Sequence, residues 1–101
     1  MAHSSIVDDR LDDIVSLIRR REAEFRSLGT AKMYAFDNLW PSKGLDVFVD
    51  YDRDSTFSLL TLAQIKLAIE DDTGLNVHIT TIDNMPESRR AELERPAVRV
   101  F

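Results

Sequence analysis

A long amphipathic helix between two short apolar segments constrains the fold of this chain more than any other feature. Residues 45–51 predict a strand with one apolar face, and its other face carries Asp46, Phe48 and Asp50. Residues 58–73 carry apolar residues at helical spacing and end before Gly74, and residues 76–82 are rich in β-branched residues. A helix of this length between two strands predicts a crossover connection that makes the strands parallel.

The N-terminal part predicts a helix over residues 5–28. Ser5 is its expected N-cap and Gly29 its expected stop, and its apolar residues recur three and four positions apart, at Leu11, Ile14, Val15 and Ile18. Acidic residues gather near the start and basic residues near the end, which complements the helix dipole. The basic run at residues 19–21 could form a binding patch, but a solvated helix end explains it more simply.

The remaining segments complete a small mixed sheet. Residues 32–36 predict a short strand, which the short connection after it makes antiparallel to the next strand, while residues 84–95 predict a helix and residues 97–101 a final strand. The predicted order is α-β-β-α-β-α-β, an α/β (α+β) fold with about four strands and with helices packed on the sheet. Residues 1–101 are expected to form one domain, with residues 1–5 disordered.

The composition excludes several classes of function. The 101 residues include 13 Lys and Arg and 18 Asp and Glu, a net charge of −5, and an acidic surface disfavours general nucleic-acid binding. The chain has no cysteine, which removes disulfides and thiolate chemistry and fits a cytoplasmic location. No apolar run approaches the roughly 18 residues that cross a bilayer, so no membrane association is expected.

Acidic residues and one histidine are the candidates for chemistry. Asp46 and Asp50 share one face of a strand but lie about 13 Å apart at 3.3 Å per residue, too far to hold one metal ion together. Asp50 and Asp52 form an Asp-x-Asp pattern that could bind a cation, although acidic residues that merely solubilise the strand end explain it more simply. His78 lies on the face opposite Val77, where a lone histidine is more often a satisfied polar group than a functional one.

Trp40 is the only tryptophan of the chain. It precedes Pro41 in the connection between the first two predicted strands. An aromatic residue in such a connection can contact a ligand or partner, or it can cover the core of its own sheet. The sequence leaves both interpretations open.

Four segments, taken in order, carry a further pattern. They are L-G-T-A-K-M-Y-A-F at residues 28–36, L-D-V-F-V-D-Y at 45–51, the helix at 59–74 and V-H-I-T at 77–80. Together they resemble the minimal nucleotidyltransferase family of the polymerase-β-like superfamily, and the resemblance covers about residues 11–101.

The resemblance implies a site that has lost most of its residues. In active members, Gly-Ser after the first strand holds nucleotide phosphates through backbone amides, and three carboxylates on the next two strands hold two Mg²⁺ ions. Here Asp37 and Asn38 stand at the Gly-Ser positions, and the three acids correspond to Gly44, Asp46 and His78. Asp46 is the only retained acid. The resemblance therefore implies vestigial nucleotide-binding positions at Asp37 and Asn38 and vestigial catalytic positions at Asp46 and His78, with no assigned metal site and no cofactor.

The resemblance favours a catalytically degenerate protein that binds another protein. Small members of the family often act as the antitoxin partner of a HEPN-domain toxin, and Leu39 and Trp40 are the expected part of such a contact. Residues 97–101 could also pair edge to edge in a homodimer, because unprotected strand edges invite pairing.

Two alternatives keep a role for nucleotides. The first is Mg²⁺-dependent nucleotidyl transfer through a remodelled site built from Asp46, His78 and either Asp50 or Asp52. The second is non-catalytic nucleotide binding in the residual pocket.

Overall fold

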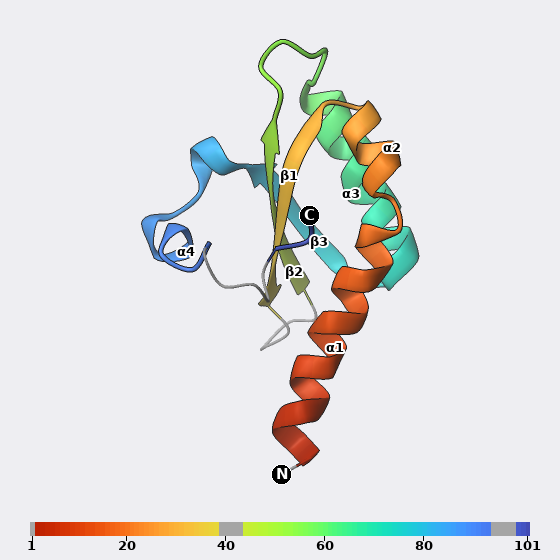
Figure 1. Cartoon of the computed structure of the whole chain (residues 1–101), viewed down its shortest axis with the longest axis vertical. Helices are drawn as coiled ribbons and strands as arrows, with labels where there is room; N and C mark the ends of the chain where they lie inside the picture. Colours follow the sequence, from red (N-terminus) through yellow and green to blue (C-terminus); the bar gives the residue numbers. More distant parts are fainter. Residues whose placement is uncertain (1, 39–43, 94–98) are drawn as a thin grey trace.

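The helix and two strands at the centre of the chain form one β-α-β unit on a mixed sheet. The computed structural model describes residues 2–38, 44–93 and 99–101, and Figure 1 shows their arrangement. The elements are α1 (Ala2–Arg19), α2 (Glu22–Ser27), β1 (Thr30–Asn38), β2 (Gly44–Tyr51), α3 (Leu59–Thr73), β3 (Asn76–Thr81), the 3₁₀ helix η1 (Ile82–Asn84) and α4 (Glu87–Arg90). The sheet order is β1-β2-β3, which confirms a small mixed α+β fold.

The ends of α3 are set by local sequence, as predicted. Ser58 is the N-cap, and its backbone N–H donates to Thr61 Oγ1 at 3.1 Å as half of a capping box. Gly74 ends the helix in the left-handed conformation, with φ of 71°, and its N–H donates to the Glu70 carbonyl at 2.8 Å. The strands on either side, β2 and β3, pair in parallel.

The predicted fourth strand is reduced to a short segment beside β1. β1 and β2 are antiparallel, as expected, and β1 is longer than predicted because pairing continues to Asn38 opposite Gly44. On the other side of β1, Val100 N–H donates to the Met33 carbonyl at 2.9 Å, and an isolated antiparallel bridge joins Tyr34 to Arg99. Residues 97 and 98 of the predicted strand lie outside the described residues.

The predicted N-terminal helix differs from the structure at its start and in its middle. It begins at Ala2, so residues 2–5, which were expected to be disordered, are helical; they contain no glycine or proline that would end the hydrogen-bond ladder. Near its end, Arg21 N–H donates to the Ile18 carbonyl at 2.9 Å, a three-residue closure that separates α1 from α2. The Arg21 guanidinium binds Asp72 on α3, where Nη2 lies 3.0 Å from Oδ1, and this contact holds the break against the neighbouring helix.

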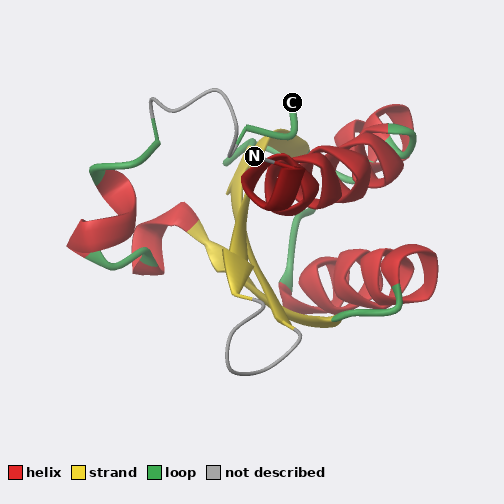
Figure 2. Cartoon of the chain, turned by 90° about the horizontal axis from the view of Figure 1, so that it is seen from below, coloured by secondary structure: helices red, strands yellow, loops and turns green. Residues whose placement is uncertain are grey.

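The core lies mainly on one face of the sheet, and Figure 2 shows the long helices on that side and the short helices η1 and α4 on the other. The larger cluster joins the sheet to α1, α2 and α3 through fully buried side chains that include Ile18, Phe25, Met33, Val47 and Ile65. Among the described residues, no helix is long and apolar enough to cross a membrane.

The other face carries a small cluster of Phe36, Phe48 and Met85 under η1 and α4. The sequence predicted one helix over residues 84–95, whereas the structure has a 3₁₀ turn and the four residues of α4. The reason is that residues 87–93 lack an apolar stripe at helical spacing, so packing does not stabilise further turns.

Candidate functional site

The sheet brings two of the predicted site residues together. Phe36 pairs with Asp46 across β1 and β2, and Asp46 pairs with His78 across β2 and β3. Directly opposed residues project from the same face, with Cβ atoms of neighbours roughly 5 Å apart. Asp46 and His78 are therefore adjacent on the face that carries η1 and α4, and Val77 is buried on the opposite face, as predicted.

The Asp46 carboxylate already has a cationic partner. Arg89 Nη2 lies 3.3 Å from Asp46 Oδ2, and the Arg89 guanidinium stacks over the Phe36 ring at 4.7 Å from its centroid. Glu92 Oε2 lies 3.6 Å from Arg89 Nη1 on the other side. The Asp46 side chain is 21% exposed and that of Arg89 30%, so this ion pair is only partly screened by water.

The other two positions that the resemblance assigns to metal ligands offer no carboxylate. Gly44 is buried and has no side chain, and the residue at the third position, His78, is exposed. Within the described ranges, no group of three or more His, Cys, Asp or Glu residues could hold a metal ion. Hard divalent cations need several converging oxygens, so the residues present do not fit a two-Mg²⁺ centre.

The Asp-x-Asp pattern spans the end of β2, and its second aspartate, Asp52, forms a turn after the strand. Asp52 Oδ1 accepts the Asp54 backbone N–H at 2.9 Å, and the Asp52 carbonyl accepts the Ser55 hydroxyl at 2.6 Å. The Asp52 carboxylate thus closes the connection to α3. Asp50 lies four positions after Asp46 on β2, so the spacing expected from the sequence holds.

The two positions that the resemblance assigns to phosphate binding belong to an extended strand. Asp37 pairs with Leu45 and Asn38 with Gly44 at the end of β1. A strand directs successive amides to opposite sides, whereas a phosphate-binding turn aims them at one point. Leu39 and Trp40, the predicted partner contact, lie outside the described residues.

A hollow of about 490 Å³ lies at the outer edge of β3, and the His78 side of the candidate site opens into it. It is lined by Gly44, Lys66, Glu70, Asn76, Val77, His78 and Ile79. Glu70 Oε2 accepts the Val77 backbone N–H at 3.0 Å and the Lys66 ammonium at 3.2 Å, and these two donors lower the pKa of Glu70. Through Oε2, the Glu70 carboxylate therefore satisfies a backbone N–H of the edge strand β3.

Sequence reasoning missed Arg89, the residue that decides the electrostatics of the site. It is 43 positions from Asp46, and nothing in its local sequence marks it, because an arginine on a short polar helix is usually solvated. Of the other predicted site residues, Asp46 and His78 are neighbours on the sheet, whereas Asp52 forms a turn.

No family model matches the chain, and no curated protein or solved structure compared with it is significantly similar. The functional interpretation therefore depends on the geometry of the chain itself and on the resemblance of its sequence pattern.

Proposed function

We propose that this chain is a catalytically degenerate, nucleotidyltransferase-like domain that acts by binding another protein. The observation that carries the proposal is the ion pair between Asp46 and Arg89. By the sequence resemblance, the expected partner is a HEPN-domain protein and the expected role is that of an antitoxin.

The ion pair argues against metal-dependent transfer at this position. Two-metal catalysis needs several carboxylates that hold both metal ions, and the two ions in turn bind the nucleoside triphosphate. Asp46 is the only carboxylate at the three corresponding positions, and a guanidinium 3.3 Å away already balances its charge. A divalent ion would have to displace Arg89 and would gain a single carboxylate in return.

The outer surface of α3 supports a role in protein binding. Leu60 and Leu67 lie two turns apart on this helix, and they are 82% and 64% exposed. Leu59 beside them is 81% exposed. Exposed apolar side chains grouped on one element are typical of a contact surface, and they lie apart from the face that carries Asp46.

The proposal is tested by two measurements on the full chain. The first incubates the protein with labelled ATP, Mg²⁺ or Mn²⁺ and a co-expressed protein encoded beside it, with Asp46→Ala as the control. We expect no transfer above the level of the control. Metal-dependent transfer that disappears in Asp46→Ala would overturn the proposal.

The second measurement identifies what a tagged copy retains from its native cell. We expect a stoichiometric complex with a small helical protein of the HEPN type. Substituting Leu60→Ser and Leu67→Ser together should weaken that complex, whereas substituting the exposed Asn84→Ser on the opposite face should not. Retention of no protein at all would count against the binding role.

A further inference from the structure

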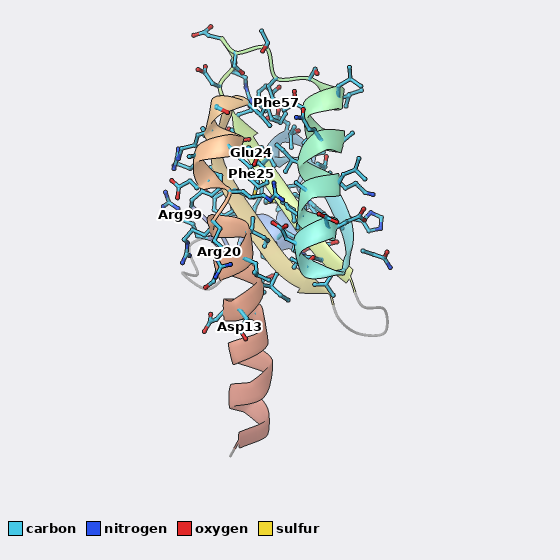
Figure 3. All side chains as sticks on the ribbon, turned by 90° about the vertical axis from the view of Figure 1, so that its right-hand side faces the viewer. Asp13, Arg20, Glu24, Phe25, Phe57 and Arg99 are labelled. Carbon is cyan, nitrogen blue, oxygen red and sulfur yellow. The ribbon has the colours of Figure 1, made fainter. Side chains whose placement is uncertain are left out.

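A second hollow, of about 440 Å³, lies where the end of α1, the start of α2 and the C-terminal segment meet. It is lined by Arg19, Glu22, Arg26, Arg99, Val100 and Phe101. Figure 3 labels Arg99 on the side of the molecule where α1 ends. Three arginines thus face one hollow on a chain whose net charge is −5.

Backbone carbonyls hold two of these arginines in place. Arg19 Nε donates to the Val100 carbonyl at 2.8 Å. Arg26 Nη1 donates to the Ala31 carbonyl at 2.9 Å, and its guanidinium lies 4.8 Å from the centre of the Phe101 ring. A carbonyl fixes the position of a guanidinium without supplying a negative charge, so these two contacts order the groups but do not themselves neutralise them.

The hollow keeps a net positive charge. Glu22 Oε2 accepts from Arg26 Nε at 2.7 Å and balances one of the three cations. Within the described part of the chain, Arg19 and Arg99 form no ion pair. By contrast, carboxylates bind the guanidinium groups outside the hollow in Arg21, Arg53 and Arg89.

The anchored cations lie at separate points. Val100 lies opposite Met33 on β1, and Ala31 is two residues along the same strand. The two accepting carbonyls therefore belong to different segments of the chain, and a bulge interrupts the pairing of β1 between Thr30 and Lys32. Because the two guanidinium groups are anchored on separate segments, two carboxylates on neighbouring turns of a helix, with Cβ atoms roughly 5–6 Å apart, can each pair with one of them.

We propose that this hollow, defined by Arg19, Arg26 and Arg99, docks an acidic helical segment of a protein partner through glutamate or aspartate side chains one turn apart. The inference rests on the proposed protein-binding function and specifies the chemistry of the bound surface. A guanidinium has five N–H donors, so the donors not engaged by the carbonyls and by Glu22 can bind carboxylates. The buried residues Val100 and Phe101 add apolar surface to the lining of the same hollow.

The test titrates the labelled protein with two alanine-based helical peptides, one with glutamates four residues apart and one with glutamines in their place. We expect the glutamate peptide alone to shift the amide resonances of residues 99–101. Its affinity should fall about tenfold between about 20 mM and about 300 mM salt, because salt screens exposed charges. Equal shifts with the glutamine peptide, or none with the glutamate peptide at millimolar concentration, would overturn the inference.

Two charge-reversal variants test whether the peptide binds at the hollow. Arg99→Glu should weaken binding of the glutamate peptide about tenfold or more, because it replaces an attraction at the hollow by a repulsion. Arg53→Glu makes the same change in net charge beside Asp83, outside the hollow, and should alter the affinity by less than about twofold. Equal losses in both variants would show attraction by overall charge only, and inorganic phosphate that displaces the peptide at equal concentration would show a compact-anion site. Either result contradicts the inference.

The same variant separates this inference from the proposed function. If Arg99→Glu retains the native partner as the unchanged protein does, the partner docks elsewhere and only the hollow is excluded. If the chain retains no partner but transfers nucleotide, the proposed function fails, while the peptide titration still reports on the hollow.

Discussion

One face of the sheet contributes to a cluster of sixteen buried residues among those described, whereas the face under η1 and α4 contributes to a cluster of three. Because buried apolar area is the main stabilising term in folding, the first face should provide most of the stability. The second face holds the Asp46–Arg89 ion pair beside Phe36 instead. Residues of the second face should therefore tolerate substitution with a smaller loss of stability than residues of the first face.

The strongest test of this comparison is a cavity on the first face. Ile65 is fully buried between α3 and the sheet, so Ile65→Ala should lower the free energy of unfolding by about 3–4 kcal/mol. Leu67 lies on the opposite side of the same helix, and Leu67→Ala should change stability by less than about 0.5 kcal/mol. Urea unfolding followed by circular dichroism measures both, and equal effects would contradict the assignment of the core.

The ion pair on the second face should have a smaller effect. Arg89→Ala removes the partner of a carboxylate that is only partly exposed and also the cover of Phe36, and we expect a loss of about 1–2 kcal/mol. A double-mutant cycle with Asp46→Ala should give a coupling energy of about 0.5–1 kcal/mol, the range for a partly solvated pair. Zero coupling would mean that the two side chains do not interact in solution.

Acid should weaken the contacts that hold α3 on the first face. Two hydrogen-bond donors, Val77 N–H and Lys66, lower the pKa of Glu70, and the Arg21 guanidinium lowers the pKa of Asp72. Carboxylates with a lowered folded-state pKa stabilise the fold above their ordinary values of 4.5 and 3.8, and the stabilisation is lost as the pH falls from these values through the folded pKa. Unfolding measured from pH 7 to pH 3 should therefore show a decline in acid.

The variant Glu70→Gln isolates one of these contributions. Its side chain still accepts from Val77 N–H but does not titrate, so the acid decline should become shallower. Glu87→Gln, an exposed change on α4, is the matched control and should keep the full decline. Identical profiles for Glu70→Gln and the unchanged protein would contradict the role of Glu70.

The smallest effect on stability is expected at the outer surface of α3. Leu60→Ala keeps a good helix former at a position that is largely exposed, so the free energy of unfolding should change by less than about 0.5 kcal/mol. The same change removes apolar surface from the proposed contact and should weaken binding of the partner. A large loss of stability would show that Leu60 packs against the chain itself.

The elements that follow from local patterns were predicted well. The alternation in β2 and the Ser58 and Gly74 ends of α3 depend on neighbouring residues, and the structure confirms them within about one residue. The break between α1 and α2 was missed because the Arg21 contact with Asp72 spans 51 positions. No periodicity within a segment can report a contact of that kind.

The candidate site was predicted only in part for the same reason. The parallel direction of β2 and β3 was predicted, and the structure adds the register that places Asp46 beside His78. The ion pair with Arg89 depends on where a short, weakly patterned helix lies after η1, and that position is set by the packing of Phe36, Phe48 and Met85. Tertiary packing, which the sequence pattern does not encode locally, decides the charge balance of the site.

The hydrogen bonds at the two edges of the sheet affect whether molecules can pair edge to edge at high concentration. At one edge the Arg19 guanidinium donates a hydrogen bond to the Val100 carbonyl, and at the other edge the Glu70 carboxylate accepts one from the Val77 N–H. A neighbouring molecule that tried to extend the sheet would have to break one of these bonds before it formed its own. Charged side chains of the chain itself therefore oppose extension of the sheet between molecules, whereas Glu70→Ala, which removes the acceptor of the Val77 N–H, would weaken this protection without altering the core.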